Sequence, residues 1–514
     1  MNNLDFVRKL YNGKNCYSDH MDNEHLELLH ISSKIEAIVS SMLKNKKIVF
    51  LTGNPGDGKT FIIKSIMNVI DETGAYYETD MNSIIDYSDI IDKIIKCYKT
   101  SEPAIIAINE YPFLILCREL KTIAPEIYSE ISKVKNEAIT YDISSPLKSR
   151  IAVIDLNERN FLDSDRKLPN ELLEKIILLL SDCTMYNKIL EANVKSLSND
   201  YVKRQFVSLL ELVAMNNIHF AIRDILGAFS FIFTACTFDE YFDLPYYSAI
   251  FVGNNPVLQV LKAFDPANLS EPTLDEKIWN GEIQTGWIMD VPNKWPCSPD
   301  YDDDVDGAVE CFINLKRKYY FENSEGEYLR ERQPNEIKKC NELFTNFESQ
   351  RKKYKEKIVH ALNKLFLSFI DNKKQLHIWT MLNYDISMEA TAAVSSKAID
   401  SSDLEIVMPR PADWLNGIEY VPNHIVLRPR GNTTPKLLLD LDFLYTLEMV
   451  ENGYPIGLIA SHYEQSVAMF LQQLDDSNIV EENDDGEVII ASRNTGFKKI
   501  ISIIDNKYGF EEDR

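Results

Sequence analysis

Short apolar runs alternate with segments of helical spacing over roughly the first 160 residues of the chain. Residues 47–52, 103–108 and 150–155 are apolar runs of strand length, and residues 76–79 form a further candidate strand. Between them, apolar residues recur at intervals of three and four, the spacing that buries one face of a helix. Apolar strands alternating with helices predict an α/β fold, with a parallel sheet covered by helices on both faces. The expected helices are residues 22–45, 61–69 and 83–98.

The pattern changes beyond this region. From about residue 170 to 240 the spacing is helical throughout, which predicts a helical lid. Residues 243–304, rich in Pro, Asn, Gly, Trp and Asp, are expected to be irregular, and residues 335–370 to form a long amphipathic helix. From about residue 400, strand-like runs flank a helix near 464–475, which predicts a mixed α/β region. The predicted domains are a sheet domain (1–165), a helical lid (166–242), an irregular and helical middle region (243–400) and a mixed α/β C-terminal domain (401–514).

Composition narrows the class of protein. With 514 residues, 45% hydrophobic and 26% charged, the chain is expected to form several globular domains. No apolar run approaches the roughly 18 residues of a membrane span, and the first thirty residues lack the pattern of a secretory signal, so we expect a cytoplasmic protein with no membrane partner. The formal net charge of −24 disfavours free DNA as the main ligand. Any contact with DNA is expected to run through partner proteins.

The candidate metal ligands are dispersed. None of the eight cysteines forms a CxxC pair, and the spacing of His20, His25 and His30 does not align on one helix face. The acidic run at 300–306 lacks the spacing of a calcium loop, so a solvated loop is the favoured interpretation. The Lys/Arg-rich face of the 335–370 helix is similarly interpreted as solvent-exposed, with a nucleic-acid or partner contact as the alternative.

The strongest chemical signal is a glycine-rich turn directly after the first apolar run. Its glycines let successive backbone N–H groups turn inward toward phosphate oxygens. A lysine at its end can bridge β- and γ-phosphates, and the next hydroxyl can bind Mg²⁺. The turn therefore predicts a P-loop for ATP and Mg²⁺, although GTP stays open as the nucleotide. Its residues are Gly53, Asn54, Pro55, Gly56, Asp57, Gly58, Lys59 and Thr60.

A second polar group is expected where another strand ends. Asn109 and Glu110 follow the apolar run 103–108. Glu110 is the candidate for orienting the attacking water. Asn109 stands where many such sites carry Asp; it can bind Mg²⁺ through water but adds no negative charge, which predicts weaker metal binding.

Polar residues after the run 150–155 are further candidates. Asp155 competes as the metal carboxylate, whereas Asn157 is favoured as a sensor of the γ-phosphate. Arg159 is a candidate arginine finger between subunits, with Arg166 as its rival and a surface arginine as the alternative for each. Arg223, at the start of a lid helix, is expected to reach the γ-phosphate, the alternative being an ion pair with a nearby acid.

Six segments together resemble the DptF-like, AAA+-type ATPases of DNA phosphorothioation-dependent restriction and related phage-defence ATPases. The resemblance covers roughly residues 45–325 and implies an ATPase that works with partner proteins which restrict DNA lacking a protective backbone modification. Lys59, Thr60, Glu110, Asn157 and Arg223 fall on the family's nucleotide motifs. The segments are TGNPGDGKT (52–60), AINEYP (107–112), VIDLNER (153–159), HFAIRDILGAFSFIFTA (219–235), NNPVLQVLKAFDPANLSEPTLDEKIW (254–279) and KRKYYFE (316–322).

The favoured function is an ATP-hydrolysing motor or switch in a multi-protein bacterial anti-phage or DNA restriction system, in a homo- or hetero-oligomer. Two alternatives stay open. One is a nucleotide-gated scaffold with negligible turnover, which the asparagine at Asn109 favours. The other is a regulatory ATPase with no role in defence.

Overall fold

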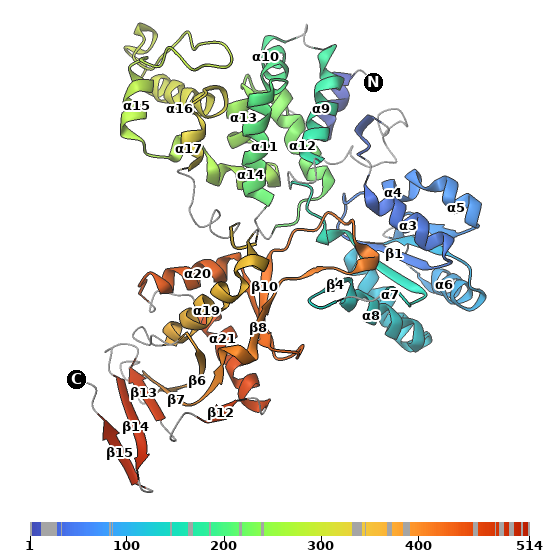
Figure 1. The fold of residues 1–514 in the computed structure, drawn as a ribbon. Coiled ribbons are helices and arrows are strands. Elements are labelled where there is room, and N and C mark those ends of the chain that lie inside the picture. The colour runs from blue at the N-terminus through green and yellow to red at the C-terminus, as the bar shows by residue number, and fades with distance from the viewer. Residues whose placement is uncertain are drawn as a thin grey trace. The chain divides into compact units, whose positions relative to one another are not determined.

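The computed structural model divides into two compact units (Figure 1). The first unit is Met1–Pro334 with Pro411–Val421, and the second is Asn335–Arg410 with Pro422–Arg514. None of the described helices is both long and apolar enough to cross a lipid bilayer. The structure describes residues 3–11, 28–31, 33–81, 84, 86–143, 146–162, 168–183, 187–214, 218–237, 241–331, 342–344, 346–366, 373–383, 391–455, 461–477, 480–482, 488–492, 498–504 and 507–511.

A four-stranded parallel sheet in the described part of the first unit confirms the predicted α/β class. Its order is β2-β3-β1-β5, so β1 lies between β3 and β5. The four strands end at the same edge of the sheet, where Thr52 of β1 lies beside Asp155 of β5. The strands are β1 (Ile48–Thr52), β2 (Tyr76–Glu78), β3 (Ala104–Ala107) and β5 (Ile151–Asp155).

Helices cover both faces of this sheet, as its apolar strands predict. Val49 and Leu51 of β1 belong to one buried cluster, whereas Ile48 and Phe50 belong to the other. This alternation is the period of two of a strand buried on both sides. The helix predicted after the glycine-rich turn is interrupted at Ile66. On the first side lie α3 (Lys34–Lys44), α4 (Lys59–Ser65) and α5 (Met67–Thr73); on the second lie α6 (Ser88–Thr100), α7 (Glu110–Ile123) and α8 (Pro125–Ala138).

Residues 411–421 pack on the same face of the sheet as α3, α4 and α5. Leu415, Ile418 and Tyr420 belong to the same buried cluster as β1 and α3. The backbone N–H of Ala412 donates to the carbonyl of Ala138 at 2.9 Å. Residues 411–421 therefore belong to the first unit, which differs from the predicted division, in which 401–514 form one domain.

The helical lid predicted for 166–242 corresponds to four helices, and helices continue beyond it. α12 is buried along its length from Ile225 to Thr234. In 243–304, which we expected to be irregular, three α-helices form among loops and short 3₁₀ turns. Two of them begin with a proline, Pro256 and Pro272, because proline fits the first helical turn and does not only end helices. The helices are α1 (Asn3–Leu10), α9 (Leu168–Ser181), α10 (Lys188–Leu197), α11 (Asp200–Ala214), α12 (Ile222–Thr234), α13 (Tyr246–Val252), α14 (Pro256–Leu261), α15 (Pro272–Trp279), α16 (Val305–Glu322) and α17 (Glu327–Glu331).

The second unit has the mixed α/β character expected of the C-terminal region. Its core includes a sheet in the order β11-β10-β8 and three helices. Within the helix predicted over 335–370, residues 347–366 form α19, and 335–341, 345 and 367–370 lie outside the described residues. The elements are α19 (Phe347–Phe366), α20 (Leu441–Glu451), α21 (Ser461–Asp476), β8 (Leu404–Val407), β10 (His424–Pro429) and β11 (Leu437–Asp440). A second sheet contains β6 (Gln375–Asn383), β7 (Thr391–Asp400), β12 (Glu481–Glu482), β13 (Val488–Ser492), β14 (Lys498–Ile504) and β15 (Lys507–Glu511).

Candidate functional site

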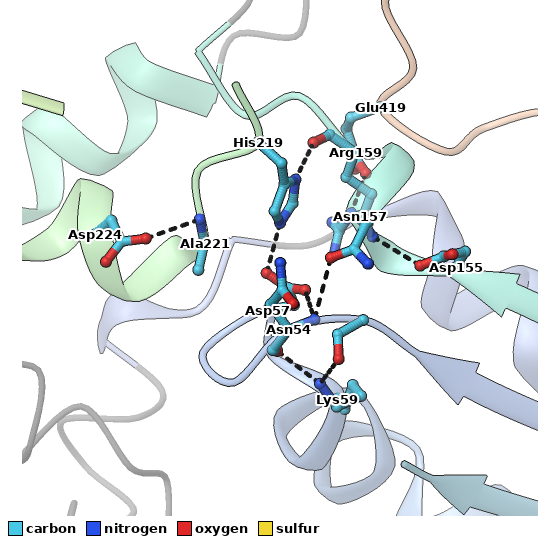
Figure 2. A network of polar contacts seen from close by, with 11 residues as sticks. Asn54, Asp57, Lys59, Asp155, Asn157, Arg159, His219, Ala221, Asp224 and Glu419 are labelled. Atoms are coloured by element: carbon cyan, nitrogen blue, oxygen red, sulfur yellow. Dashed lines mark hydrogen bonds and ion pairs between the residues drawn. The ribbon is translucent and has the colours of Figure 1, made fainter. Parts of the chain in front are cut away.

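The glycine-rich loop (residues 53–58) joins the end of β1 to the first turn of α4 (Figure 2). Gly53, Gly56 and Gly58 have φ angles of 138°, 102° and 85°. Residues with a side chain rarely adopt such angles. At Gly53 a Cβ would also lie 2.6 Å from Oδ2 of Asp57. Between the glycines, Asn54 and Pro55 are exposed. The glycine spacing read from the sequence thus matches the positions where the backbone excludes other residues.

Lys59 begins α4 and turns its side chain back onto the loop. Its Nζ donates to the carbonyl oxygens of Gly53 at 3.0 Å and Asn54 at 2.7 Å. Burial lowers the pKa of Lys59 to about 8, against the opposing effect of nearby carboxylates, of which Asp57 has the largest. A buried ammonium group at this loop is a cation available to an anionic ligand.

The predicted magnesium ligands lie at the same edge of the sheet. Thr60 Oγ1 donates to the carbonyl of Thr79 at 3.2 Å, just after β2. Asn109 immediately precedes α7, beside the end of β1. Among the described residues, no group of three or more His, Cys, Asp or Glu side chains could hold a metal ion. A hydroxyl and an amide fit a Mg²⁺ ion that is held mainly by phosphates and water, as is usual for this metal, and not by a cage of protein ligands.

Glu110 is the first residue of α7 and is exposed to solvent. The backbone N–H of Ile108 donates to the carbonyl of Leu51 at 3.0 Å, which holds the end of β3 against the end of β1. The parallel pairing therefore places Glu110 on the same edge of the sheet as the loop.

The structure brings Asn157 onto the loop. Its Oδ1 accepts a hydrogen bond from the backbone N–H of Asn54 at 3.1 Å. Asp155, at the end of β5, accepts from the N–H of Asn157 at 3.1 Å and so fixes the 3₁₀ turn η2 (Leu156–Glu158). Asn157 therefore contacts the backbone of the glycine-rich loop, and its role as a sensor of the γ-phosphate stays a prediction.

Helix α12 also contacts the loop. A Cβ at Gly56 would lie 3.0 Å from Cβ of Arg223 and 3.3 Å from Cβ of Ala221. A Cβ at Gly58 would lie 3.3 Å from Cδ1 of Ile222. The first turn of α12, which includes Arg223, thus packs directly against the loop.

Two residues of the site were not singled out from the sequence as a pair. The Asp57 carboxylate is fully buried; its Oδ2 accepts from the N–H of Asn54 at 2.5 Å, and its Oδ1 lies 2.8 Å from Nε2 of His219 (Figure 2). Burial lowers the pKa of His219, but the hydrogen bond and charge of Asp57 outweigh it, so the pKa is raised. The sequence offers one indication that His219 belongs to the site: it lies just before the helix that contains Arg223.

Arg159 does not have the environment expected of an arginine finger. Its guanidinium is buried; Nε donates to Oε2 of Glu419 at 2.6 Å, and the group stacks over the ring of Phe161. The prediction of a finger offered to a neighbouring subunit is corrected to an ion pair within the chain, formed because residues 411–421 fold back onto the first unit. The rival, Arg166, lies outside the described residues.

No protein-family model matches the chain, and searches of curated proteins and of solved structures found no match.

Proposed function

We propose that the chain is a P-loop ATPase with an AAA+-like helical lid, which binds ATP at the glycine-rich loop and hydrolyses it. One observation carries the proposal. Three glycines with positive φ turn the chain between a buried parallel strand and a helix, and the ammonium group of Lys59 lies over that turn. Inward-facing amides beside a buried cation suit the tail of a nucleoside triphosphate.

The surrounding residues supply the remaining chemistry. Water attacks the γ-phosphorus, and the bond to the β–γ bridging oxygen breaks to leave ADP and phosphate. Glu110 orients this water by accepting a hydrogen bond from it, while Lys59, Asn157 and Arg223 stabilise charge on the γ-phosphate. Thr60, and Asn109 through water, would hold Mg²⁺, whose charge offsets that of the phosphates.

Nucleotide binding is tested by calorimetry with ATP and Mg²⁺. Wild type should bind, and Lys59→Ala should lose about 100-fold in affinity, because a charge-assisted contact with phosphate contributes roughly 1.5–3 kcal/mol. Lys64→Ala is the matched control, since Lys64 is an exposed lysine on the same helix. No binding by wild type at millimolar ATP would contradict the proposal.

The second candidate is a nucleotide-gated scaffold. It is favoured by Asn109, which offers the metal no negative charge at the end of β3. Steady-state phosphate release separates the two candidates. An ATPase should lose at least about tenfold in rate in Glu110→Gln, since general-base catalysis contributes roughly 10²–10⁴-fold. If wild type binds ATP and releases phosphate no faster than Glu110→Gln, the scaffold is the better description.

We extend the proposal to a role as motor or switch in a multi-protein bacterial restriction or anti-phage system, on the resemblance of residues 45–325 to DptF-like ATPases. The net charge of −24 favours contact with DNA through partner subunits. Gene neighbourhood tests this extension. Adjacent genes for DNA modification or restriction would support it, and housekeeping neighbours would count against it.

A further inference from the structure

A buried histidine–aspartate contact joins the residues just before α12 to the glycine-rich loop. Asp57 belongs to the loop and is fully buried, and the side chain of His219, just before α12, is 16% exposed. Nε2 of His219 lies 2.8 Å from Oδ1 of Asp57, and Nδ1 lies 3.2 Å from the carbonyl oxygen of Arg159 (Figure 2). The ring is therefore held at both nitrogens by two different parts of the first unit.

The partners of the ring determine its protonation. A backbone carbonyl oxygen only accepts hydrogen bonds, and so does an ionised carboxylate. Each ring nitrogen of His219 must then carry a proton to satisfy its partner, which makes the ring an imidazolium cation. The raised pKa of His219 agrees with this conclusion, because the hydrogen bond and charge of Asp57 outweigh the effect of burial.

The charge has a consequence for the loop. Asp57 Oδ2 accepts from the N–H of Asn54, so a carboxylate is built into the turn that is proposed to hold phosphates. Left alone, its negative charge would repel a triphosphate, and the repulsion would be strong because the group is buried. The imidazolium of His219 neutralises it without disturbing the hydrogen bond to Asn54.

We propose that His219 is a positioning residue of the nucleotide site: as a cation supplied by the lid, it neutralises Asp57 and makes triphosphate affinity depend on its own protonation. This inference rests on the proposed ATP-binding function. It adds control of ATP binding by pH, which the glycine motif alone does not provide. The affinity for ATP falls when the ring of His219 loses a proton and, with it, one of its two hydrogen bonds.

The charged groups around the ring set the direction of this dependence. Asp57 faces it from the loop, and Asp155 and Glu158 contribute negative charge from the end of β5 and from η2. Arg159 offers the ring only its carbonyl oxygen, because its guanidinium pairs with Glu419. On the lid side, Arg223 adds a positive charge in the first turn of α12. The three acids hold the proton on His219 at low pH, so ATP affinity should fall as pH rises.

The test is calorimetric ATP titration with Mg²⁺ at pH 6.0 and 8.5, on the full chain. We expect His219→Gln to weaken binding about tenfold at pH 6.0, the equivalent of one charge-assisted hydrogen bond. The pH dependence of ATP affinity should also become smaller in this variant, and what remains should be the loss of charge on Lys59, whose pKa is about 8. Asp57→Asn keeps an acceptor for Asn54 and a donor for a neutral ring, so it should bind ATP at both pH values. The double variant should recover most of the affinity that His219→Gln loses, because no uncompensated carboxylate remains.

Controls separate this inference from the proposed function. His360→Gln removes a buried histidine–carboxylate pair, His360–Glu451, in the second unit and should leave ATP binding unchanged. If wild type binds ATP and Lys59→Ala does not, the nucleotide site stands. Unchanged affinity in His219→Gln would then overturn the role of His219 alone, as would a double variant as weak as the single one. Absence of binding in wild type would overturn both.

Discussion

At the scale of single residues, the glycines of the loop are required for two separate reasons. Gly56 has a φ of 102°, an angle outside the regions open to residues with a Cβ. A Cβ there would also meet Cβ of Arg223 at 3.0 Å. Backbone conformation and packing of the lid therefore exclude a side chain at the same position.

Replacing Gly56 by alanine should disturb the loop and the lid together. We expect a loss of at least about 2 kcal/mol in the free energy of unfolding and the loss of ATP binding, since the left-handed angle alone costs roughly 1–2 kcal/mol. Gly74→Ala is the matched control, because Gly74 has a φ of 65° and open space around its Cβ position. Urea unfolding and ATP titration measure both effects. Equal losses in the two variants would show that packing against Arg223 contributes nothing.

The pair of His219 and Asp57 also predicts how stability changes with pH. The pKa of His219 is raised above its ordinary value of 6.5, so its contribution to stability is fully present below about pH 6.5 and is lost as pH rises through the raised pKa. Lys59 has the opposite effect: because its pKa is lowered to about 8, the stability of the folded protein rises with pH from about pH 8 upward as this buried group loses its charge. The free energy of unfolding of wild type should therefore fall relative to that of Asp57→Asn between pH 6.5 and 8. A constant difference over this range would contradict the imidazolium assignment.

At the scale of elements, one ion pair fastens the end of β5 to residues 411–421. Arg159 and Glu419 have side chains only 4% and 9% exposed, with Nε and Oε2 2.6 Å apart. The backbone N–H of Asn160 also donates to the carbonyl of Glu419 at 2.5 Å. Removing one partner of an ion pair this deeply buried greatly lowers the free energy of unfolding, because the remaining charged group is then neither paired nor solvated by water.

Glu419→Ala should therefore lower the free energy of unfolding by roughly 3–5 kcal/mol, as it leaves the Arg159 guanidinium buried without its partner. The double variant Arg159→Met/Glu419→Leu should recover most of this loss, because it buries no charge. Glu72→Ala serves as control: Glu72 pairs with Lys44 at the surface, where ion pairs contribute less than about 1 kcal/mol. Chemical denaturation distinguishes these outcomes. A loss in Glu419→Ala no larger than in Glu72→Ala would show that the pair is dispensable.

At the scale of the whole molecule, the chain crosses between its two units. Residues 411–421 belong to the first unit although their neighbours in sequence belong to the second. Leu415, Ile418 and Tyr420 are 1%, 1% and 7% exposed in the core beneath β1. The first unit is thus incomplete without a piece of chain that follows the start of the second.

A fragment of residues 1–334 should accordingly be less stable than the same fragment carrying residues 411–421 on a flexible linker. Each buried apolar side chain contributes roughly 1.5–3 kcal/mol, so the difference should be several kcal/mol. A linked segment with Leu415 and Ile418 both changed to alanine is the control, and it should recover little. Thermal unfolding of the three fragments measures the effect. Equal midpoints would contradict the assignment of 411–421 to this core.

Local patterns in the amino-acid sequence were enough to predict the strands of the parallel sheet and the glycine-rich loop. These features depend on local rules, namely the period of the apolar residues and the φ angles open only to glycine. The expected irregular stretch from 243 was partly wrong for a local reason as well, since Pro256 and Pro272 begin helices there.

The contacts that hold the site together could not be predicted before the fold was known. His219 and Asp57 are 162 positions apart in the chain, and Arg159 and Glu419 are 260 apart. No local pattern links such residues, because their contact depends on how α12 and residues 411–421 return to the sheet. For the same reason an arginine interpreted from its neighbours as free for another subunit proved to be bound within its own chain: burial and pairing are properties of the folded molecule.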